Sequence, residues 1–94
     1  MIESKRVFVV HGWSGYPEEG WRTWLKSELE KEDFRVFVPT MPNTDNPKLN
    51  SWLKRLIKTV GTPDKNCYFV GHSLGCITIL RYLETLKKNQ EVGG

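Results

Sequence analysis

Apolar residues recur along this chain in two patterns, which are short continuous runs and longer stretches with helical spacing. Three short runs, rich in β-branched and aromatic residues, stand at 6–10, 35–38 and 67–70, and none alternates with polar positions. Runs of this kind predict strands that are buried on both faces and are therefore parallel. Apolar residues spaced three and four apart follow each run and predict amphipathic helices. The predicted order is β-α-β-α-β-α.

Each predicted helix has a stripe of large apolar residues that we expect to face the sheet. The second helix should begin near Asn46 and Pro47, which are typical of an N-cap and a first helical position, and should end at Gly61. The third helix is expected over 74–88. The three stripes are Trp21, Trp24, Leu25 and Leu29; Leu49, Trp52, Leu53, Leu56, Ile57 and Val60; and Ile77, Leu80, Leu83 and Leu86.

Strands that alternate with helices predict an α/β fold with one parallel sheet and right-handed crossovers. In doubly wound folds the third strand usually lies on the far side of the first. We therefore expect the sheet order 2-1-3, with flanking helices that make three layers. Residues 1–94 are expected to form a single domain.

Composition narrows the class of protein. With 38% hydrophobic and 27% charged residues, the chain is typical of a globular domain and not of a disordered one. The net charge is +3, and the scattered basic residues favour a solvated surface over a nucleic-acid site. No stretch is long enough for a membrane span, and residues 1–6 lack a signal-peptide core, so we expect a cytoplasmic protein. Cys67 and Cys76 are expected to be buried and free.

The strongest chemical signal is GHSLG at 71–75, which has the form G-x-S-x-G. It lies between the predicted third strand and third helix, as a nucleophile elbow requires, because the sharp turn lifts a serine hydroxyl above the sheet. Ser73 is therefore the candidate nucleophile, and Gly71 and Gly75 permit the tight turn. The helix N-terminus offers the Leu74 N–H as an oxyanion donor. The competing interpretation is a chance glycine-rich turn.

A second loop, HGW at 11–13, follows the predicted first strand. In the order 2-1-3 the first and third strands are neighbours, so the loops that follow them face each other. The backbone N–H of Gly12 or Trp13 is the candidate second oxyanion donor. The alternative is a loop whose glycine only permits the turn, with Trp13 covering the edge of the core.

No residue stands where this motif needs a catalytic base. Of the two histidines, His72 lies inside the motif and is expected to pack, and His11 would be an unusual base in the adjacent loop. The residues after the motif contain no histidine and no aspartate. Turn and capping roles account for Asp33, Asp45 and Asp64.

Taken together, these motifs resemble the small α/β-hydrolase-fold serine hydrolases of the retinoblastoma-binding-protein type. The resemblance rests on FVVHGWSG at 8–15, WRTWLKSEL at 21–29, MPNTDNPKLNSWLKRL at 41–56 and YFVGHSLGCITILRYLE at 68–84. It implies hydrolysis of small esters or related acyl substrates, with Ser73 as nucleophile, an oxyanion hole formed partly by residues 11–13, and no metal or organic cofactor. Family members are roughly twice as long, within the range of one domain. Their second half brings the triad aspartate and histidine, which match no position here.

The resemblance implies that this chain is the N-terminal half of such a domain and is inactive alone. The third strand would be central in the complete fold, so its outer edge should be exposed here and should recruit another strand. We expect a homo-oligomer, built across this edge or the adjoining apolar surface. Two competing hypotheses are a non-catalytic protein-interaction module that uses the exposed edge, and a flavodoxin-like ligand binder. The absence of a G-x-G-x-x-G loop weakens the second hypothesis.

Overall fold

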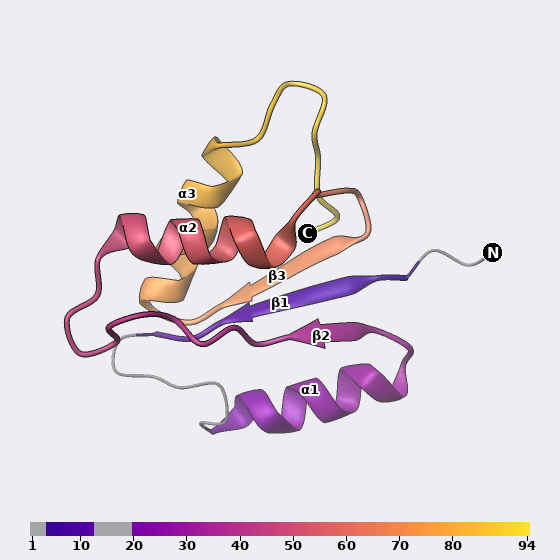
Figure 1. Cartoon of the computed structure of the whole chain (residues 1–94). Coiled ribbons are helices and arrows are strands. Elements are labelled where there is room, and N and C mark those ends of the chain that lie inside the picture. The colour runs from indigo at the N-terminus through magenta and orange to yellow at the C-terminus, as the bar shows by residue number, and fades with distance from the viewer. Residues whose placement is uncertain (1–3, 13–19) are drawn as a thin grey trace.

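The computed structural model describes residues 4–12 and 20–94, which form a parallel sheet with helices on both faces (Figure 1). The strands are β1 (Arg6–Val10), β2 (Arg35–Phe37) and β3 (Cys67–Gly71), and the helices are α1 (Trp21–Lys31), α2 (Leu49–Val60) and α3 (Leu74–Glu84). Both neighbours of β1 are parallel to it, and the order is β2-β1-β3. The predicted α/β fold and its 2-1-3 order are confirmed.

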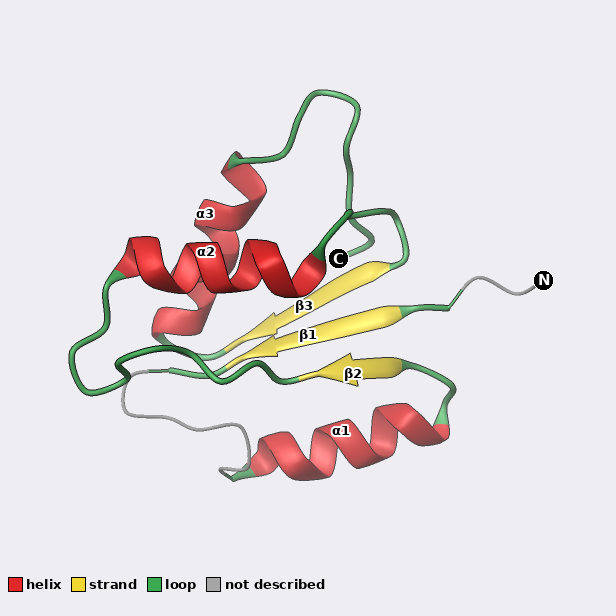
Figure 2. Ribbon diagram, viewed as in Figure 1, coloured by secondary structure: helices red, strands yellow, loops and turns green. Residues whose placement is uncertain are grey.

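Three layers result, with α1 on one face of the sheet and α2 and α3 on the other (Figure 2). Alternate side chains of β1 point to opposite faces. Phe8 and Val10 therefore belong to the core under α2 and α3, and Val7 and Val9 pack toward α1. The larger core comprises Phe8, Val10, Met41, Trp52, Leu56, Val60, Cys67 and Tyr82.

Helix α2 buries its stripe through Trp52, Leu56 and Val60, as predicted, although Ile57 is exposed. Its start differs from the prediction. Lys48 is the N-cap, and its carbonyl accepts the first helical bond from the Trp52 N–H. Asn46 instead donates its N–H to the Asn43 carbonyl, because residues 43–46 form a turn of their own.

In α1 the predicted stripe is only partly inward. Leu25 and Leu29 pack against the sheet, whereas Trp21 and Trp24 are exposed. The two tryptophans lie at the flank of the stripe, since a helix that contacts a sheet buries only the middle of its apolar face.

Helix α3 turns a different face to the sheet from the one that we predicted. Gly75, Thr78 and Tyr82 are its buried residues. The absence of a side chain at Gly75 lets α3 approach the end of β1, and this turns the face that bears these three residues toward the sheet. The exposed residues of α3 include Cys76, which was expected to be buried, and the three large hydrophobics Ile77, Leu80 and Leu83. Cys67 is buried as predicted, and both cysteines are free.

The end of α3 also differs from the expected 74–88. The helix ends at Glu84, because both the N–H and the hydroxyl of Thr85 donate to the Tyr82 carbonyl, which tightens the last turn. Of the predicted third stripe, Leu86 does pack against the core. No helix in the described part of the chain has the length and apolar character needed to cross a membrane.

The last residues of the chain lie along the outer edge of β3 (Figure 1). The Gly93 N–H donates to the Cys67 carbonyl, and the Phe69 N–H donates to the Gly94 oxygen, each at 2.8 Å. Both chains advance in the same direction across these bonds, so residues 93–94 run parallel to β3. The first part of the edge that we expected to be free is therefore paired. The homo-oligomer stays a prediction.

Candidate active site

The chain turns sharply from β3 into α3 at the G-x-S-x-G motif. Ser73 is the N-cap of α3, with φ 56° and ψ −122°, and its side chain is exposed. The Cys76 N–H donates to the Ser73 carbonyl at 2.9 Å, which closes the first turn of the helix. The strand, turn and helix that the motif requires are all present.

The backbone conformation of Ser73 is one that side chains rarely adopt. Its φ and ψ match the first central position of a type II′ turn, where glycine dominates. The chain has glycine at two other positions with nearly the same conformation, Gly20 (60°, −135°) and Gly61 (70°, −121°). Placing a serine there costs about 1–3 kcal/mol of local strain.

The Ser73 hydroxyl does not cap α3, and the first backbone N–H of the helix is unused in the described part of the chain. A serine at an N-cap ordinarily accepts a hydrogen bond from the first turn, but Ser73 makes no side-chain cap bond. Within the described residues, no acceptor takes the Leu74 N–H. An exposed hydroxyl therefore stands next to an unused backbone donor that lies at the positive end of the helix.

The two motif glycines are required by close packing, as predicted. A Cβ at Gly71 would lie 2.9 Å from the Cys76 backbone, and a Cβ at Gly75 would overlap the Val10 carbonyl oxygen. Contacts this short are excluded for any side chain. The glycines thus fix how tightly α3 folds back over β3 and β1.

The loop after β1 lies against this turn, as the strand order predicts. The His72 N–H donates to the Val10 carbonyl at 3.1 Å, which extends the pairing of β1 with β3 into the motif. Gly12 is buried, and a Cβ there would lie 3.0 Å from the Ser73 Cβ. Trp13, the other candidate donor, lies outside the described residues.

His11 is buried and bonded to the backbone, so it is not placed as a base for Ser73. The Met41 N–H donates to His11 Nε2 at 3.3 Å, which assigns the ring proton to Nδ1, 3.1 Å from the Gly12 carbonyl oxygen. The ring also meets Trp52 edge to face, with centroids 5.6 Å apart. Through the bond from Met41, His11 connects the loop after β2 to the end of β1.

His72 is exposed, and its ring lies edge to face with Trp21, with centroids 6.3 Å apart. This contact agrees with the predicted packing role. No hydrogen bond joins the Ser73 hydroxyl to either histidine within the described residues.

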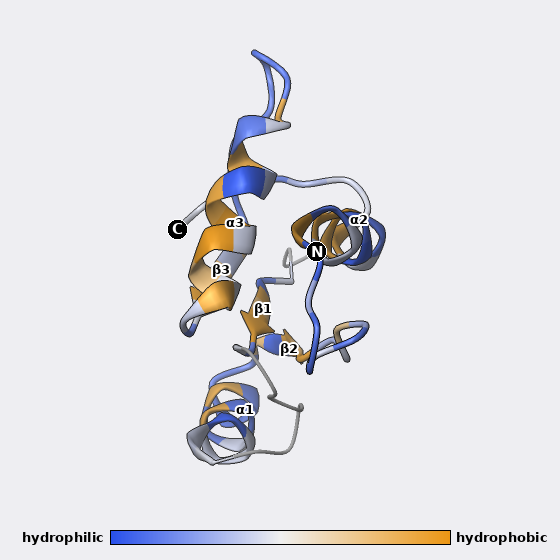
Figure 3. Cartoon of the chain, turned by 90° about the vertical axis from the view of Figure 1, so that its left-hand side faces the viewer, coloured by the Kyte–Doolittle hydropathy of each residue, from blue (hydrophilic) through white to orange (hydrophobic). Residues whose placement is uncertain are grey.

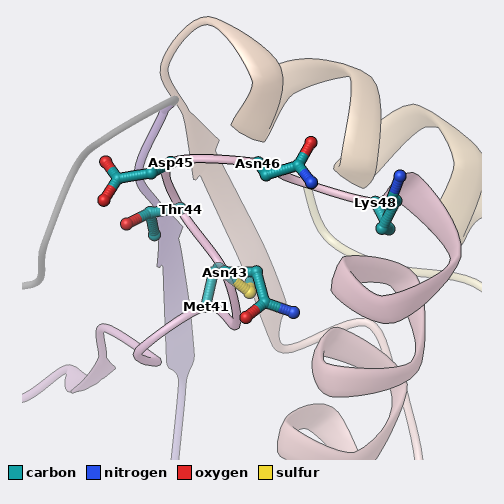
Figure 4. A pocket seen from close by; sticks show the side chains of 6 residues that line it. All are labelled: Met41, Asn43, Thr44, Asp45, Asn46 and Lys48. Carbon is teal, nitrogen blue, oxygen red and sulfur yellow. The ribbon is translucent and has the colours of Figure 1, made fainter.

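The loop between β2 and α2 forms an open pocket that the sequence did not reveal (Figure 4). The cavity has a volume of about 570 Å³ and is lined by Met41, Asn43, Thr44, Asp45, Asn46 and Lys48. His11 holds Met41, and the Trp52 indole N–H donates to the Pro42 carbonyl at 2.8 Å. These bonds fix the pocket at the same end of the sheet as Gly12. Its amides, hydroxyl and charged groups suit a small polar ligand.

Two of the carboxylates have the turn roles that we predicted. Asp64 accepts the Asn66 N–H at 2.8 Å, and Asp33 has a φ of 67° in the turn after α1. In residues 4–12 and 20–94, no three His, Cys, Asp or Glu side chains gather as a metal site would require. The expectation that no cofactor is needed stays a prediction.

A parallel 2-1-3 sheet with a serine on the sharp turn after its third strand is the arrangement of an α/β hydrolase. The family model for serine hydrolases matches residues 7–94. The chain therefore belongs to the serine hydrolase family.

Two curated relatives and one solved structure agree with this assignment. The putative hydrolase YdeN of Bacillus subtilis (strain 168) is 37% identical over 97% of this chain and 48% of its own length. The serine hydrolase RBBP9 of Rattus norvegicus is 28% identical over 90% of this chain and 47% of its own length. The crystal structure of the B. subtilis ydeN gene product, 37% identical, superposes with a TM-score of 0.90 over 97% of this chain and 49% of that one. The chain thus spans about half the length of the curated relatives that it matches.

Proposed function

We propose that this chain is the nucleophile-bearing N-terminal half of an α/β-hydrolase domain that cleaves small esters or related acyl substrates. The Ser73 Oγ attacks the acyl carbon while its proton passes to a base, and the base returns this proton to the departing alkoxide, so that the alcohol leaves. Water then hydrolyses the acyl-serine. The Leu74 N–H and an N–H from Gly12 or Trp13 stabilise the oxyanion of each tetrahedral intermediate.

The observation that carries this proposal is the serine at a position with a glycine-type backbone. A strained conformation persists where surrounding structure enforces it, and such positions cluster at functional sites. Gly71 and Gly75 enforce the turn, and the strain leaves the Ser73 hydroxyl exposed and uncapped. A serine that served only to begin α3 would adopt ordinary N-cap geometry and bond the helix.

The catalytic base and its acid partner come from outside these residues. His11 is buried with both ring nitrogens against backbone groups, and His72 packs on Trp21. The relatives named as hydrolases are about twice as long, which leaves room for both groups. Without a base, catalysis falls to what binding and the oxyanion hole supply, about 10³–10⁴-fold over water.

Hydrolysis of p-nitrophenyl acetate by the chain and by its Ser73→Ala variant tests the missing base. We expect both rates to be low and close to each other. Rapid hydrolysis that Ser73→Ala abolishes would overturn this part of the proposal, because a base would then lie within the chain.

Urea unfolding of the Ser73→Gly variant tests the strain. Glycine adopts this conformation freely, so the variant should be more stable than the wild-type chain by about 1 kcal/mol. Ser73→Ala serves as the control and should give no such gain, since alanine keeps a Cβ. Equal stability of the glycine and alanine variants would remove the observation on which the proposal rests.

A non-catalytic interaction module is the second candidate, and the exposed apolar face of α3 favours it. We predict a cytoplasmic location for either candidate, and cell fractionation would test it.

A further inference from the structure

A cavity of about 440 Å³ lies against the β2 edge of the sheet. Among the described residues β2 pairs only with β1, so it is the last strand on that side (Figure 2). Viewed along the strands, β2 lies at one end of the sheet, with α1 on one side of the sheet and α2 on the other (Figure 3). Lys26 of α1 and Arg55 and Thr59 of α2 line the cavity, together with residues 36–40. We call this cavity the β2 groove.

The backbone at this edge offers hydrogen-bonding groups to the β2 groove. The Arg35 N–H donates to the Lys5 carbonyl, on the β1 side, at 2.9 Å. In a parallel pair the backbone groups of alternate residues point to the neighbouring strand, so those of Val36 and Val38 point to the open edge. Both residues line the β2 groove. In residues 4–12 and 20–94 no further strand pairs with this edge, so an extended polypeptide can add to the sheet here.

The side chains that flank the β2 groove are cationic. Lys26 stands on the α1 side, Arg55 stands on the α2 side, and Arg35 shares a face of β2 with Phe37; the three cationic side chains are exposed. The Arg35 guanidinium lies over the Phe37 ring, 5.4 Å from its centroid, and Arg55 Nη1 donates to the Thr40 carbonyl at 3.1 Å. These partners are neutral. No carboxylate in the described part of the chain forms an ion pair with any of the three cations.

The charge of the β2 groove decides what fits it. Symmetric antiparallel pairing with the β2 strand of a second copy would bring Lys26 and Arg55 beside the same residues of that copy, and lysine at a strand edge keeps such edges apart. A polypeptide that carries carboxylates meets opposite charge instead. Because successive side chains of an added strand point to opposite faces, its carboxylates reach the cations of both helix layers.

We propose that the β2 groove binds an extended, acidic polypeptide segment, which adds to the sheet as a strand. Its backbone bonds Val36 and Val38, and its carboxylates pair with Lys26 on one face and with Arg35 and Arg55 on the other. The edge over residues 35–40 fits a segment of about the same length. The β2 groove and the G-x-S-x-G turn lie at strands on opposite sides of β1, so this surface is separate from the candidate active site.

Fluorescence anisotropy with labelled hexapeptides tests the proposal. The probe is EEVVEE, KKVVKK reverses its charge, and EEPPEE lacks two central N–H groups because proline has none. We expect EEVVEE to bind. KKVVKK should bind at least about tenfold more weakly because its charge is repelled. EEPPEE should bind about tenfold more weakly because two backbone hydrogen bonds are lost.

Charge reversal in the protein locates the binding site. Lys26→Glu and Arg55→Glu should each weaken the binding of EEVVEE about fivefold, because an attraction between exposed charges becomes a repulsion. Lys54→Glu is the matched control. Lys54 is an exposed cation of α2 that does not line the β2 groove, and its substitution changes the net charge by the same amount. It should weaken binding by less than about twofold.

Amide hydrogen exchange reports whether the peptide adds to the strand. The amides of Val36 and Val38 should exchange more slowly when EEVVEE is present. The proposal fails if the three charge reversals weaken binding equally, or if EEPPEE binds as tightly as EEVVEE. It also fails if a deoxythymidylate hexamer binds more tightly than EEVVEE and loses affinity in the Lys26→Glu and Arg55→Glu variants, since the β2 groove would then be a nucleic-acid site. No readout requires hydrolysis.

Discussion

Helices α2 and α3 pack against each other on the same face of the sheet, but they use their apolar residues in opposite ways. α2 turns its large residues inward, and Leu56 is fully buried. α3 buries Gly75, Thr78 and Tyr82, with Gly75 against the end of β1, and it exposes Leu80. An apolar stripe thus shows which side of a helix avoids water, but it does not show which neighbour covers that side.

The largest expected difference is between alanine substitutions at the two leucines. Leu56→Ala should destabilise the isolated chain by about 2–5 kcal/mol, because it empties part of a packed core. Leu80→Ala should change stability by no more than about 0.5 kcal/mol. Urea unfolding followed by tryptophan fluorescence measures both. Similar losses for the two variants would mean that α3 buries Leu80 in this chain.

The close approach of α3 to β1 is tested by adding a methyl group at Gly75. Gly75→Ala should cost about 3 kcal/mol, because its Cβ would overlap the Val10 carbonyl and push α3 away from β1. Gly61→Ala, at the end of α2, is the control. It meets open space but has a φ of 70°, so we expect a loss of about 1 kcal/mol. If Gly61→Ala cost more than Gly75→Ala, close packing would not determine how α3 is seated.

The next comparison is between the two histidines, since His11 is buried against Trp52 of α2 and His72 is exposed beside Trp21 of α1. His11→Ala should cost about 1–3 kcal/mol, because the buried Met41 N–H loses its acceptor. His72→Ala should cost no more than about 0.5 kcal/mol, since the side chain is exposed. Thermal unfolding by circular dichroism measures both. A larger loss for His72→Ala would contradict the structural role of His11.

The smallest effect concerns Tyr82, the one large side chain that α3 buries among the described residues. Burial raises the pKa of its phenol above 10.0, Cys67 adds to the rise, and Arg6 opposes it. The folded chain therefore holds this proton more tightly than the unfolded chain. The stability contribution is full below pH 10.0 and is lost as the pH rises through the folded pKa.

Tyr82→Phe should remove this alkaline slope. We expect the stability difference between wild type and variant to be constant at neutral pH and to shift in favour of the variant above about pH 10. Urea midpoints measured across this range would check it. If the urea midpoints of the two proteins changed in parallel up to the highest pH, burial would not raise the pKa of Tyr82.

The sequence predicts the sheet well because its signals are local. Each strand is a short β-branched run bounded by turn residues, and the predicted 35–38 and 67–70 differ from Arg35–Phe37 and Cys67–Gly71 by one residue each. The order 2-1-3 could be predicted because the third strand of a doubly wound fold usually lies on the far side of the first. The G-x-S-x-G motif likewise predicts its own strand-turn-helix context, since its glycines have a steric role.

The remaining features depend on tertiary contacts that no local pattern encodes. The seating of α3 follows from the contact between Gly75 and Val10, which are far apart in the sequence. The pocket after β2 depends on His11 holding Met41, and residues 93–94 pair with β3 through two backbone bonds. Glycines at the end of a chain show no strand pattern, so this pairing could not be predicted.

The central claim of the proposed function is that Ser73 is a nucleophile whose base lies outside residues 1–94. Fluorophosphonate labelling tests it most directly, on the isolated chain, on a fusion in which the C-terminal half of the B. subtilis relative follows Gly94, and on the same fusion with Ser73→Ala. We expect labelling of the fusion at Ser73, little labelling of the isolated chain, and none of the Ser73→Ala fusion. Labelling that persists in the Ser73→Ala fusion, or a folded fusion that is not labelled, would contradict the claim.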